Sequence, residues 1–262
     1  MYVTYNKRTY RLPDFLIIGL GKCGTTTLAE LLNSHPDIGM SAVKEPHFFS
    51  YDYIFERGIP WYATLFNQCR DAKIIGEAST SYSRIHQHPD VHHRIYEYLP
   101  DARIIMMVRH PMDRIISAYI EWLATPNHDQ TYDSINEALT GMSTFIDASR
   151  YWKIYTTYTT LFGQENIHVV WFDDLIKKQQ ETFSEVCRFL GVEETGLPAH
   201  NTIQANTRVE VEQRARDFGR NAENVDLRWN QQSRDLLRRE LEADITRFLK
   251  HFKREDLWSD LF

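Results

Sequence analysis

One short segment of the chain places a lysine and three threonines around a glycine-rich turn. The turn has the sequence GLGKCG at 19–24 and follows an apolar run at 15–18. That run is too short for a typical helix and suits a buried strand. The threonines at 25–27 follow the turn and can begin a helix that continues through 28–32. Backbone N–H groups, the positive end of the helix dipole and the Lys22 ammonium would then face one anion, so this segment predicts a phosphate site.

Three kinds of nucleotide-binding turn share parts of this pattern. The glycines match the dinucleotide fingerprint G-x-G-x-x-G, which requires an acidic residue about 20 positions later, at the end of a second strand. Glu45 lies near that distance, but its Lys-Glu-Pro context is typical of a turn. The Walker A pattern requires a lysine directly before serine or threonine, whereas Lys22 precedes Cys23 and Gly24. The segment at 19–28 instead resembles a third kind, a phosphosulfate loop, and a turn without a ligand would not need the lysine and the hydroxyls.

A second group of polar residues follows the other clear strand pattern, RIIMMVR at 103–109. Arg109 lies at the carboxyl end of this predicted strand, where open α/β sheets bind ligands. Pro111 suits the first turn of the next helix, and Ser117 lies about two turns into that helix. An arginine fork and a hydroxyl are suited to one phosphate. Alone, the pair could equally be a buried arginine and an ordinary helix residue, but the glycine turn favours a second phosphate site.

Composition limits the class of protein. With 262 residues, 42% of them hydrophobic and 13% aromatic, the chain can bury a sizeable core. A net charge of -6 argues against nucleic acid as a partner and, mildly, against a strongly polyanionic substrate. No apolar run approaches the ~20 residues of a membrane span, and the residues at 1–11 contain no signal-peptide core. Three scattered cysteines suit neither a disulfide framework nor a zinc site, and the histidines at 86–93 lack ligand spacing, so we expect a cytoplasmic protein without a metal.

Strand-like runs alternate with helix-like segments along the chain. The predicted strands are at 15–18, 37–40, 73–77, 103–109 and 166–172. The predicted helices are at 28–32, 89–99, 111–124, within 132–141 and 149–162, and at 173–190, and the charged segment at 209–248 is expected to be mostly helical. This alternation predicts an α/β fold in which a mostly parallel sheet is flanked by helices. We expect a single domain over 1–262, with nucleotide-binding motifs at 14–28 and 103–117 and a helical C-terminal part at 209–262.

The two predicted phosphate sites, at 14–28 and 103–117, are called the two anchors. Together they resemble the corresponding motifs of the sulfotransferases that use 3′-phosphoadenosine 5′-phosphosulfate (PAPS). The segment at 19–28 resembles their 5′-phosphosulfate loop, and the Arg-x-Pro turn with a serine eight residues after the arginine resembles their 3′-phosphate motif. KEPHFF at 44–49, GIPWY at 58–62 and later segments up to 192 are similar to heparan sulfate and bacterial sulfotransferases. The resemblance implies a P-loop-kinase-like sulfotransferase fold and no metal. The cofactor-binding residues that it implies are Gly21, Lys22, Cys23, Gly24, Thr25, Thr26, Thr27, Arg109, Ser117 and Arg208.

The same resemblance implies in-line transfer of a sulfuryl group from PAPS to an acceptor, with release of adenosine 3′,5′-bisphosphate (PAP). Catalysis would then depend on positioning and electrostatics, as in phosphoryl transfer. Lys22 would stabilise the leaving bridge oxygen, and Glu45, at the position of the catalytic glutamate of heparan-type enzymes, would accept the proton of the acceptor hydroxyl. His47 is the alternative base, and Glu45 could instead pair with Lys44 or Arg84 at the surface.

The acceptor is predicted from the residues near Glu45. Aromatic side chains there could form either a pocket wall or core: Phe48, Phe49, Tyr51, Trp61 and Tyr62. Where the heparan enzymes have a lysine soon after a glutamate, this chain has Glu77-Ala78-Ser79-Thr80. With the negative net charge, this favours a small neutral or cationic acceptor whose hydroxyl, in preference to an amine, is sulfated. A saccharide is the second candidate, a P-loop-like kinase or a non-catalytic nucleotide-binding module are alternatives of other classes, and the oligomeric state is left open.

Overall fold

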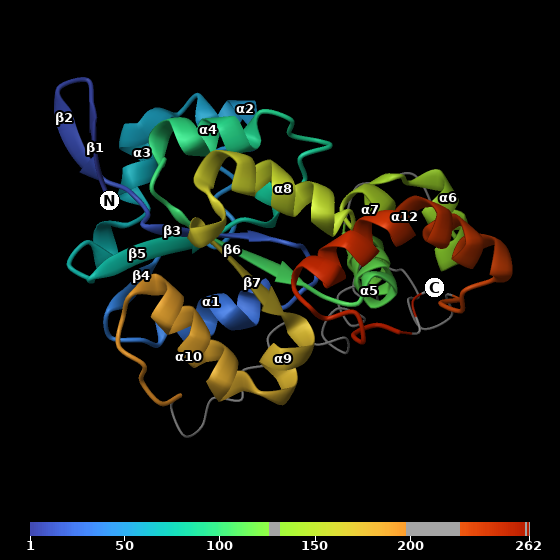
Figure 1. The fold of residues 1–262 in the computed structure, drawn as a ribbon. Coiled ribbons are helices and arrows are strands. Elements are labelled where there is room, and N and C mark those ends of the chain that lie inside the picture. The colour runs from blue at the N-terminus through green and yellow to red at the C-terminus, as the bar shows by residue number, and fades with distance from the viewer. Residues whose placement is uncertain (126–131, 198–225, 260, 262) are drawn as a thin grey trace. The chain divides into compact units, whose positions relative to one another are not determined.

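The computed structural model describes residues 1–125, 132–197, 226–259 and 261 (Figure 1). The chain divides into two compact units, one formed by Met1–Val108 with Ile154–Ala205 and the other by Arg109–Lys153 with Asn206–Phe262. The expected single domain over 1–262 stays a prediction, because much of its C-terminal part lies outside the described residues. The two units are described separately.

The first unit is built on a five-stranded sheet. In spatial order its strands are β4 (Ile38–Met40), β5 (Ile74–Ala78), β3 (Phe15–Gly19), β6 (Arg103–Val108) and β7 (Ile167–Trp171) (Figure 1). Every pairing in this sheet is parallel. All residues of β3 are buried, as expected for a central strand that has neighbours on both edges and helices on both faces. The predicted parallel α/β sheet is therefore confirmed.

Helices cover both faces of this sheet (Figure 1). On one side are α1 (Thr25–Asn33), α9 (Phe172–Lys177) and α10 (Gln179–Leu190), and on the other are α3 (Gly58–Thr64), α4 (Val91–Tyr98) and the first unit's part of α8 (Tyr151–Phe162). The single helix predicted over 173–190 is wrong, because Lys178 adopts φ -137° and ψ 49° and so separates α9 from α10. The predicted end of α10 is confirmed, since Gly191 takes the left-handed conformation of a helix C-terminus, with φ 69°.

The short elements of the first unit connect these layers. They are α2 (Asp52–Phe55) and the 3-10 helices η1 (Asn67–Cys69), η2 (Thr80–Ser83) and η3 (Gln164–Asn166). An antiparallel hairpin, β1 (Tyr2–Tyr5) and β2 (Arg8–Arg11), precedes the sheet and was not expected from the sequence.

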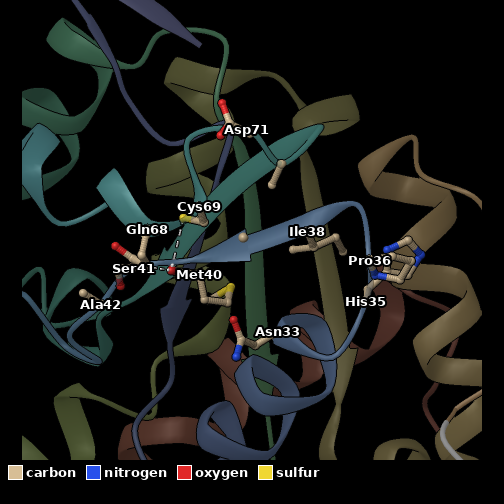
Figure 2. A pocket seen from close by; sticks show the side chains of 12 residues that line it. Asn33, His35, Pro36, Ile38, Met40, Ser41, Ala42, Gln68, Cys69 and Asp71 are labelled. Carbon is tan, nitrogen blue, oxygen red and sulfur yellow. Dashed lines mark hydrogen bonds between the residues drawn. The ribbon is translucent and has the colours of Figure 1, made fainter.

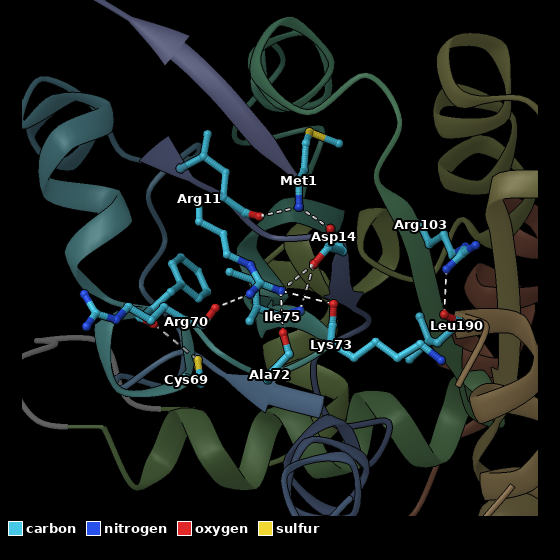
Figure 3. A network of polar contacts seen from close by, with 12 residues as sticks. Met1, Arg11, Asp14, Cys69, Arg70, Ala72, Lys73, Ile75, Arg103 and Leu190 are labelled. Atoms are coloured by element: carbon cyan, nitrogen blue, oxygen red, sulfur yellow. Dashed lines mark hydrogen bonds and ion pairs between the residues drawn. The ribbon is translucent and has the colours of Figure 1, made fainter. Parts of the chain in front are cut away.

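Arg11 and Asp14, just before β3, connect the chain by hydrogen bonds to the neighbouring segments. The backbone of Asp14 joins both neighbours of β3, since its N–H donates to Ile75 O (2.7 Å) and its carbonyl accepts from Arg103 N (3.0 Å). The Asp14 carboxylate also accepts from the backbone N–H of Ile75 (2.9 Å). Arg11 donates to the carbonyl oxygens of Arg70, Ala72 and Lys73 (Figure 3). The start of the central strand is therefore fixed by side chains as well as by the sheet.

The described part of the second unit is mostly helical. Its helices are α5 (Pro111–Leu123), α6 (Ile135–Gly141), α7 (Thr144–Asp147) and α12 (Gln231–His251). Arg114 of α5 is buried, and its guanidinium donates to Phe145 O (2.6 Å) and to Ser149 Oγ (2.7 and 3.0 Å). Asp244 of α12 accepts hydrogen bonds from the first backbone N–H groups of α8, at 2.9 and 3.0 Å. These contacts satisfy helix ends in the interior of the unit.

Among the described residues, no helix combines the length and the apolar character that are needed to cross a membrane. The cytoplasmic location stays a prediction.

Candidate functional site

The predicted glycine turn connects β3 to α1. Gly24 is the N-cap of α1 and adopts a left-handed conformation, with φ 85° and ψ 19°. A residue with a side chain would be strained here, and its Cβ would lie 2.9 Å from Cδ2 of Phe172. Gly24 also brings no capping side chain to the helix. This geometry suits a helix N-terminus that receives an anion.

Lys22 lies in the middle of the turn, with φ 70° and a half-buried side chain. The turn is held against the neighbouring strand, because Leu20 N donates to Met107 O of β6 (2.7 Å). Lys22 therefore lies at the carboxyl edge of the sheet, next to the end of the central strand β3. Ligands of open α/β folds bind at this edge, where the strand order reverses. The other predicted side chains of the turn are buried or half-buried: Cys23, Thr25, Thr26 and Thr27.

The helix η2, which follows β5, packs directly against the glycine turn. A Cβ on Gly21 would lie 3.8 Å from Cβ of Thr80, and a Cβ on Gly19 would lie 3.3 Å from Cα of Thr80. Ser79, just before η2, donates its backbone N–H to Ile17 O of β3 (3.0 Å). The segments that follow β3 and β5 are therefore in contact.

Three consecutive hydroxyls after β5 hold Glu45 and His47. Ser79 Oγ accepts from the backbone N–H of His47 (3.1 Å), Thr80 Oγ1 donates to Glu45 Oε2 (2.8 Å), and Ser81 Oγ lies 2.8 Å from His47 Nδ1. Glu45 and His47 both have left-handed backbones, with φ 58° and 55°. For residues other than glycine this conformation costs on the order of 1 kcal/mol or more, and such strain is concentrated at functional sites. We call this segment, residues 45–47, the Glu45–His47 turn.

The side chains of the Glu45–His47 turn interact with each other, since His47 Nε2 lies 3.4 Å from Glu45 Oε2. Burial alone would raise the pKa of Glu45, but the charge of Lys44, 3.0 Å from Oε1, and the hydrogen bonds from Lys44 and Thr80 outweigh it, so the pKa is lowered. Burial lowers the pKa of His47; the Glu45 carboxylate opposes this effect and the charge of Arg84 adds to it. Near neutral pH the pair is therefore a carboxylate beside a neutral imidazole, and both can accept a proton.

A further carboxylate, that of Glu77, is fully buried at the end of β5. The hydroxyls of Tyr62 and Tyr82 donate to its Oε1 (2.8 and 2.6 Å), and Ser79 Oγ donates to its Oε2 (2.7 Å). Burial raises the pKa of Glu77 to about 7 against the opposing effect of these hydrogen bonds. No role for Glu77 was predicted from the sequence. Its one sequence signal is a carboxylate within an otherwise apolar strand.

The aromatic residues predicted near the acceptor separate into two groups. Phe48, Phe49 and Tyr62 are fully buried, with Phe48 stacked on Tyr62 at a ring-centroid distance of 4.3 Å. These three residues are core, because they expose no surface that an acceptor could contact. Tyr51 and Trp61 are half-buried, and the Tyr51 ring meets that of His47 edge-on at 5.2 Å. Tyr51 is thus the aromatic residue of this set that touches the Glu45–His47 turn.

The residues of the second predicted anchor belong to the second unit. Arg109 directly follows β6 and is half-buried, and its carbonyl accepts from the hydroxyl of Tyr151 (2.7 Å). Ser117 is half-buried on α5, which begins at Pro111 as predicted. The buried arginine of this segment, which satisfies carbonyl and hydroxyl groups, is Arg114. The predicted contact of Arg208 lies outside the described residues.

A pocket of about 680 Å³ lies along the edge strand β4 and is lined by none of the predicted site residues (Figure 2). At one end of it, Gln68 Nε2 and Cys69 Sγ donate to Met40 O, at 2.9 and 3.4 Å. Side chains from η1 therefore cover part of the hydrogen-bonding edge of the sheet, which protects an edge strand from pairing with another chain.

Comparison with known proteins identifies the family. The family model described as "Sulfotransferase domain" matches residues 12–253. Human heparan sulfate glucosamine 3-O-sulfotransferase 6 is 40% identical over 114 residues, which cover 44% of this chain and 32% of that protein. A sulfotransferase from Alicyclobacillus acidocaldarius is 25% identical, with a TM-score of 0.65 over 90% of this chain and 99% of that one. A mouse sulfotransferase complexed with PAP shares the fold, at 14% identity and a TM-score of 0.50 over 96% and 99% of the two chains.

The alignments cover from 24% to 54% of the length of the curated relatives that the chain matches. The family model, in contrast, covers most of this chain, including both anchors at 14–28 and 103–117. The structural likeness confirms the P-loop-kinase-like fold that the sequence predicts. This chain belongs to the sulfotransferase family.

Proposed function

We propose that the protein is a PAPS-dependent sulfotransferase that transfers a sulfuryl group to an acceptor hydroxyl. The observation that carries the proposal is the position of Thr80, which packs against Gly21 of the glycine turn and donates a hydrogen bond to Glu45. An anion site and a proton acceptor are thereby adjacent at the carboxyl edge of a parallel sheet. Family membership and a PAP-bound structural neighbour support PAPS as the donor.

The residues of the glycine turn fit a donor that carries a 5′-phosphate. When bound, PAPS would supply an activated sulfuryl group, and PAP would be its product. Gly24 keeps the N-terminus of α1 accessible to the phosphate, and the threonine hydroxyls at 25–27 would add hydrogen bonds. Lys22 would stabilise the negative charge that develops on the leaving bridge oxygen. In the second unit Arg109 and Ser117 would bind the 3′-phosphate, with Arg208 as a further proposed contact.

Glu45 is the proposed general base, with His47 as the alternative. The pKa of each group is lowered, so each is in its proton-accepting form at neutral pH. The ordinary pKa values of a glutamate and a histidine differ, however, and this difference distinguishes Glu45 from His47 as the base. Protonation of Glu45, if Glu45 is the base, should lower kcat only at pH values below the ordinary pKa of a glutamate. Protonation of His47, if His47 is the base, should lower kcat at pH values below the ordinary pKa of a histidine.

The proposed acceptor is a small neutral molecule with a hydroxyl group. Besides burial, which lowers the pKa of His47 most, the positive charges of Arg84 and Lys44 lower it against the opposing Glu45 carboxylate, and two cations beside the turn favour a neutral acceptor over a cationic one. A saccharide is the second candidate. It is favoured by Arg84, which is half-buried and makes no ion pair within the described part of the chain, and by relatives whose names specify heparan sulfate glucosamine.

Titration calorimetry with PAP in the absence of Mg²⁺ tests the donor. We expect Arg109→Ala to weaken PAP binding about 10- to 150-fold, equivalent to about 1.5–3 kcal/mol for a hydrogen bond to a charged group. Arg70→Ala, which removes an exposed guanidinium of the first unit, is the matched control and should bind PAP as the wild type does. Binding of ATP with Mg²⁺, but not of PAP, would overturn the proposal in favour of a nucleotide kinase.

Transfer from radiolabelled PAPS to a panel of acceptors tests the chemistry. Sulfation of small neutral alcohols supports the main proposal, and sulfation restricted to heparan-derived oligosaccharides supports the saccharide. Glu45→Gln should abolish transfer and leave PAP binding intact. If Glu45→Gln retains full transfer, Glu45 is not the base, and if the wild type binds PAP but sulfates no acceptor of the panel, a non-catalytic binding module is favoured.

A further inference from the structure

Glu77 is connected to the Glu45–His47 turn through a single hydroxyl. Ser79 Oγ donates to Glu77 Oε2 (2.7 Å) and accepts from the backbone N–H of His47 (3.1 Å). A hydroxyl has only one proton to donate, so the state of Glu77 decides where that proton points. Ionised Glu77 can only accept and therefore fixes the Ser79 proton. Protonated Glu77 can itself donate to Ser79 Oγ, which then accepts from both Glu77 and His47 N–H; the hydroxyl is no longer polarised by a carboxylate and holds the His47 N–H less strongly.

The turn that depends on this hydroxyl is strained. His47 adopts φ 55° and Glu45 adopts φ 58°, conformations that persist only where surrounding contacts enforce them. Two of the backbone contacts that enforce them come from adjacent residues at the end of β5, namely Ala78 O, which accepts from Glu45 N (2.9 Å), and Ser79 Oγ; His47 O also accepts from the N–H groups of Ser50 and Tyr51 (3.0 and 3.3 Å). A change at Ser79 therefore affects the backbone of residues 45–47, which orients the side chains of both candidate bases.

We propose that Glu77 is a positioning residue which, through the hydroxyl of Ser79, holds the Glu45–His47 turn more firmly when ionised than when protonated. The hydrogen-bond chain alone supports the coupling between Glu77 and the turn. Only the consequence for catalysis rests on the proposed sulfotransferase function.

The surroundings of Glu77 place its protonation in the neutral range. Tyr62 of α3 and Tyr82 of η2 are the titratable groups that donate to it, and the nearby charge of Glu45 raises its pKa. The adjacent strands β3 and β4 contain no titratable residue, and Glu30 of the neighbouring helix α1 is exposed. Within the described ranges Glu77 has no ion pair. Burial therefore dominates and raises the pKa to about 7.

The consequence for catalysis is that kcat should depend on an ionisation that belongs to neither candidate base. Above about pH 7 Glu77 is a carboxylate, Ser79 is fixed and the turn is held. Below that pH the turn is held less firmly, and kcat should fall, although Glu45 and His47 are both still unprotonated. Protonation of Glu77 should not itself change PAP binding, because the glycine turn is not part of the Glu77–Ser79–His47 chain of hydrogen bonds.

The chemical shift of the His47 backbone amide tests the coupling without a need for the acceptor. In wild-type protein this amide should titrate with a midpoint near pH 7. In Glu77→Gln, a neutral isostere of the protonated acid, that transition should disappear, and the shift at pH 8 should match the wild-type shift at pH 6. A transition near pH 7 that persists in Glu77→Gln would overturn the proposal, as would its absence from wild-type protein.

Two further variants keep the test decisive if Glu77→Gln does not fold. Tyr62→Phe removes a hydrogen bond that lowers the pKa of Glu77, so the His47 transition should move to higher pH. Ser79→Ala should abolish the transition while the side-chain carbon of Glu77 still titrates. An unmoved midpoint in Tyr62→Phe or an intact His47 transition in Ser79→Ala would contradict the proposal. Calorimetry with PAP on the same samples shows separately whether the proposed function fails.

Discussion

Gly24→Ala should destabilise the protein by two separate effects. The backbone at Gly24 has φ 85°, which costs an L-residue with a side chain about 1–2 kcal/mol. The new Cβ would also lie 2.9 Å from Cδ2 and 3.2 Å from Cε2 of Phe172, closer than ordinary van der Waals contact. Overpacking of this kind typically costs about 1–3 kcal/mol. We therefore expect a total loss of about 2–5 kcal/mol in the free energy of unfolding.

Gly191→Ala is the matched control. Gly191 is also left-handed, with φ 69°, but the nearest atoms to its new Cβ would be the guanidinium of Arg103 at 3.5 Å, an ordinary contact. This variant should therefore lose only the backbone part, about 1–2 kcal/mol. The difference between the two alanine variants isolates the clash with Phe172. In a double-mutant cycle, Phe172→Leu should recover that difference in Gly24→Ala and should recover nothing in Gly191→Ala.

Urea denaturation followed by tryptophan fluorescence measures these losses. For an m-value near 3 kcal/mol/M, a loss of 3 kcal/mol moves the midpoint by about 1 M urea. Equal midpoints for Gly24→Ala and Gly191→Ala would refute the clash argument, and a cycle without coupling would refute the role of Phe172. A PAP titration of the folded Gly24→Ala protein then shows whether the turn also tolerates a Cβ when it binds an anion.

Other predictions concern stability. Arg114→Ala removes the charged donor to Ser149 Oγ and to Phe145 O, although Phe145 O still accepts from Ser149 Oγ, and should cost about 1.5–3 kcal/mol in thermal or urea unfolding, whereas Asp113→Asn, at an exposed position of the same helix, should cost less than about 1 kcal/mol. Asp244→Ala removes the acceptor at the N-terminus of α8 and should cost about 1–2 kcal/mol, against less than about 0.5 kcal/mol for the exposed Glu242→Ala; equal losses would contradict the capping role. Burial lowers the pKa of His168 to about 4, so the unfolded chain binds the extra proton first, and the native protein should lose up to about 3 kcal/mol of stability as the pH falls from about 6.5 to 4. Unfolding of wild type and His168→Gln at pH 4.5 and 7.5 checks this sign, because the variant should lack that part of the slope.

The sheet could be predicted from the sequence because its strands are short, apolar and separated by helix-like segments. The run at 15–18 and the apolar residues at 104–108 are buried throughout, which is why neither shows the alternation of a half-exposed strand. The break at Lys178 could not be predicted. The sequence around it has no glycine or proline, and the interruption depends on how α9 and α10 each pack in the fold.

The candidate site could be proposed from the sequence where its residues lie in a short local pattern. The glycine turn and Glu45 lie in short motifs, and the structure places them on the two sides of Thr80. Glu77 was not recognised, because its properties come from burial and from hydroxyls of Tyr62 and Tyr82, which no local spacing brings together. The same limit applies to Phe48, where an aromatic side chain of the core and one of a pocket wall look alike in sequence.

The order of strands in the sheet has a consequence for how the chain folds. The two strands that pair with the central strand β3 are both distant from it in the sequence, since Phe15 pairs with Gly76 on one side and with Arg103 on the other. The β6–β7 pairing, from Ile104 to Ile167, is also remote along the chain. Such pairings require long loops to close before any strand contact forms, which slows folding and leaves the apolar run of β3 uncovered in intermediates. Recovery from denaturant should therefore be limited by aggregation during refolding and should improve on dilution, even where the native state is stable.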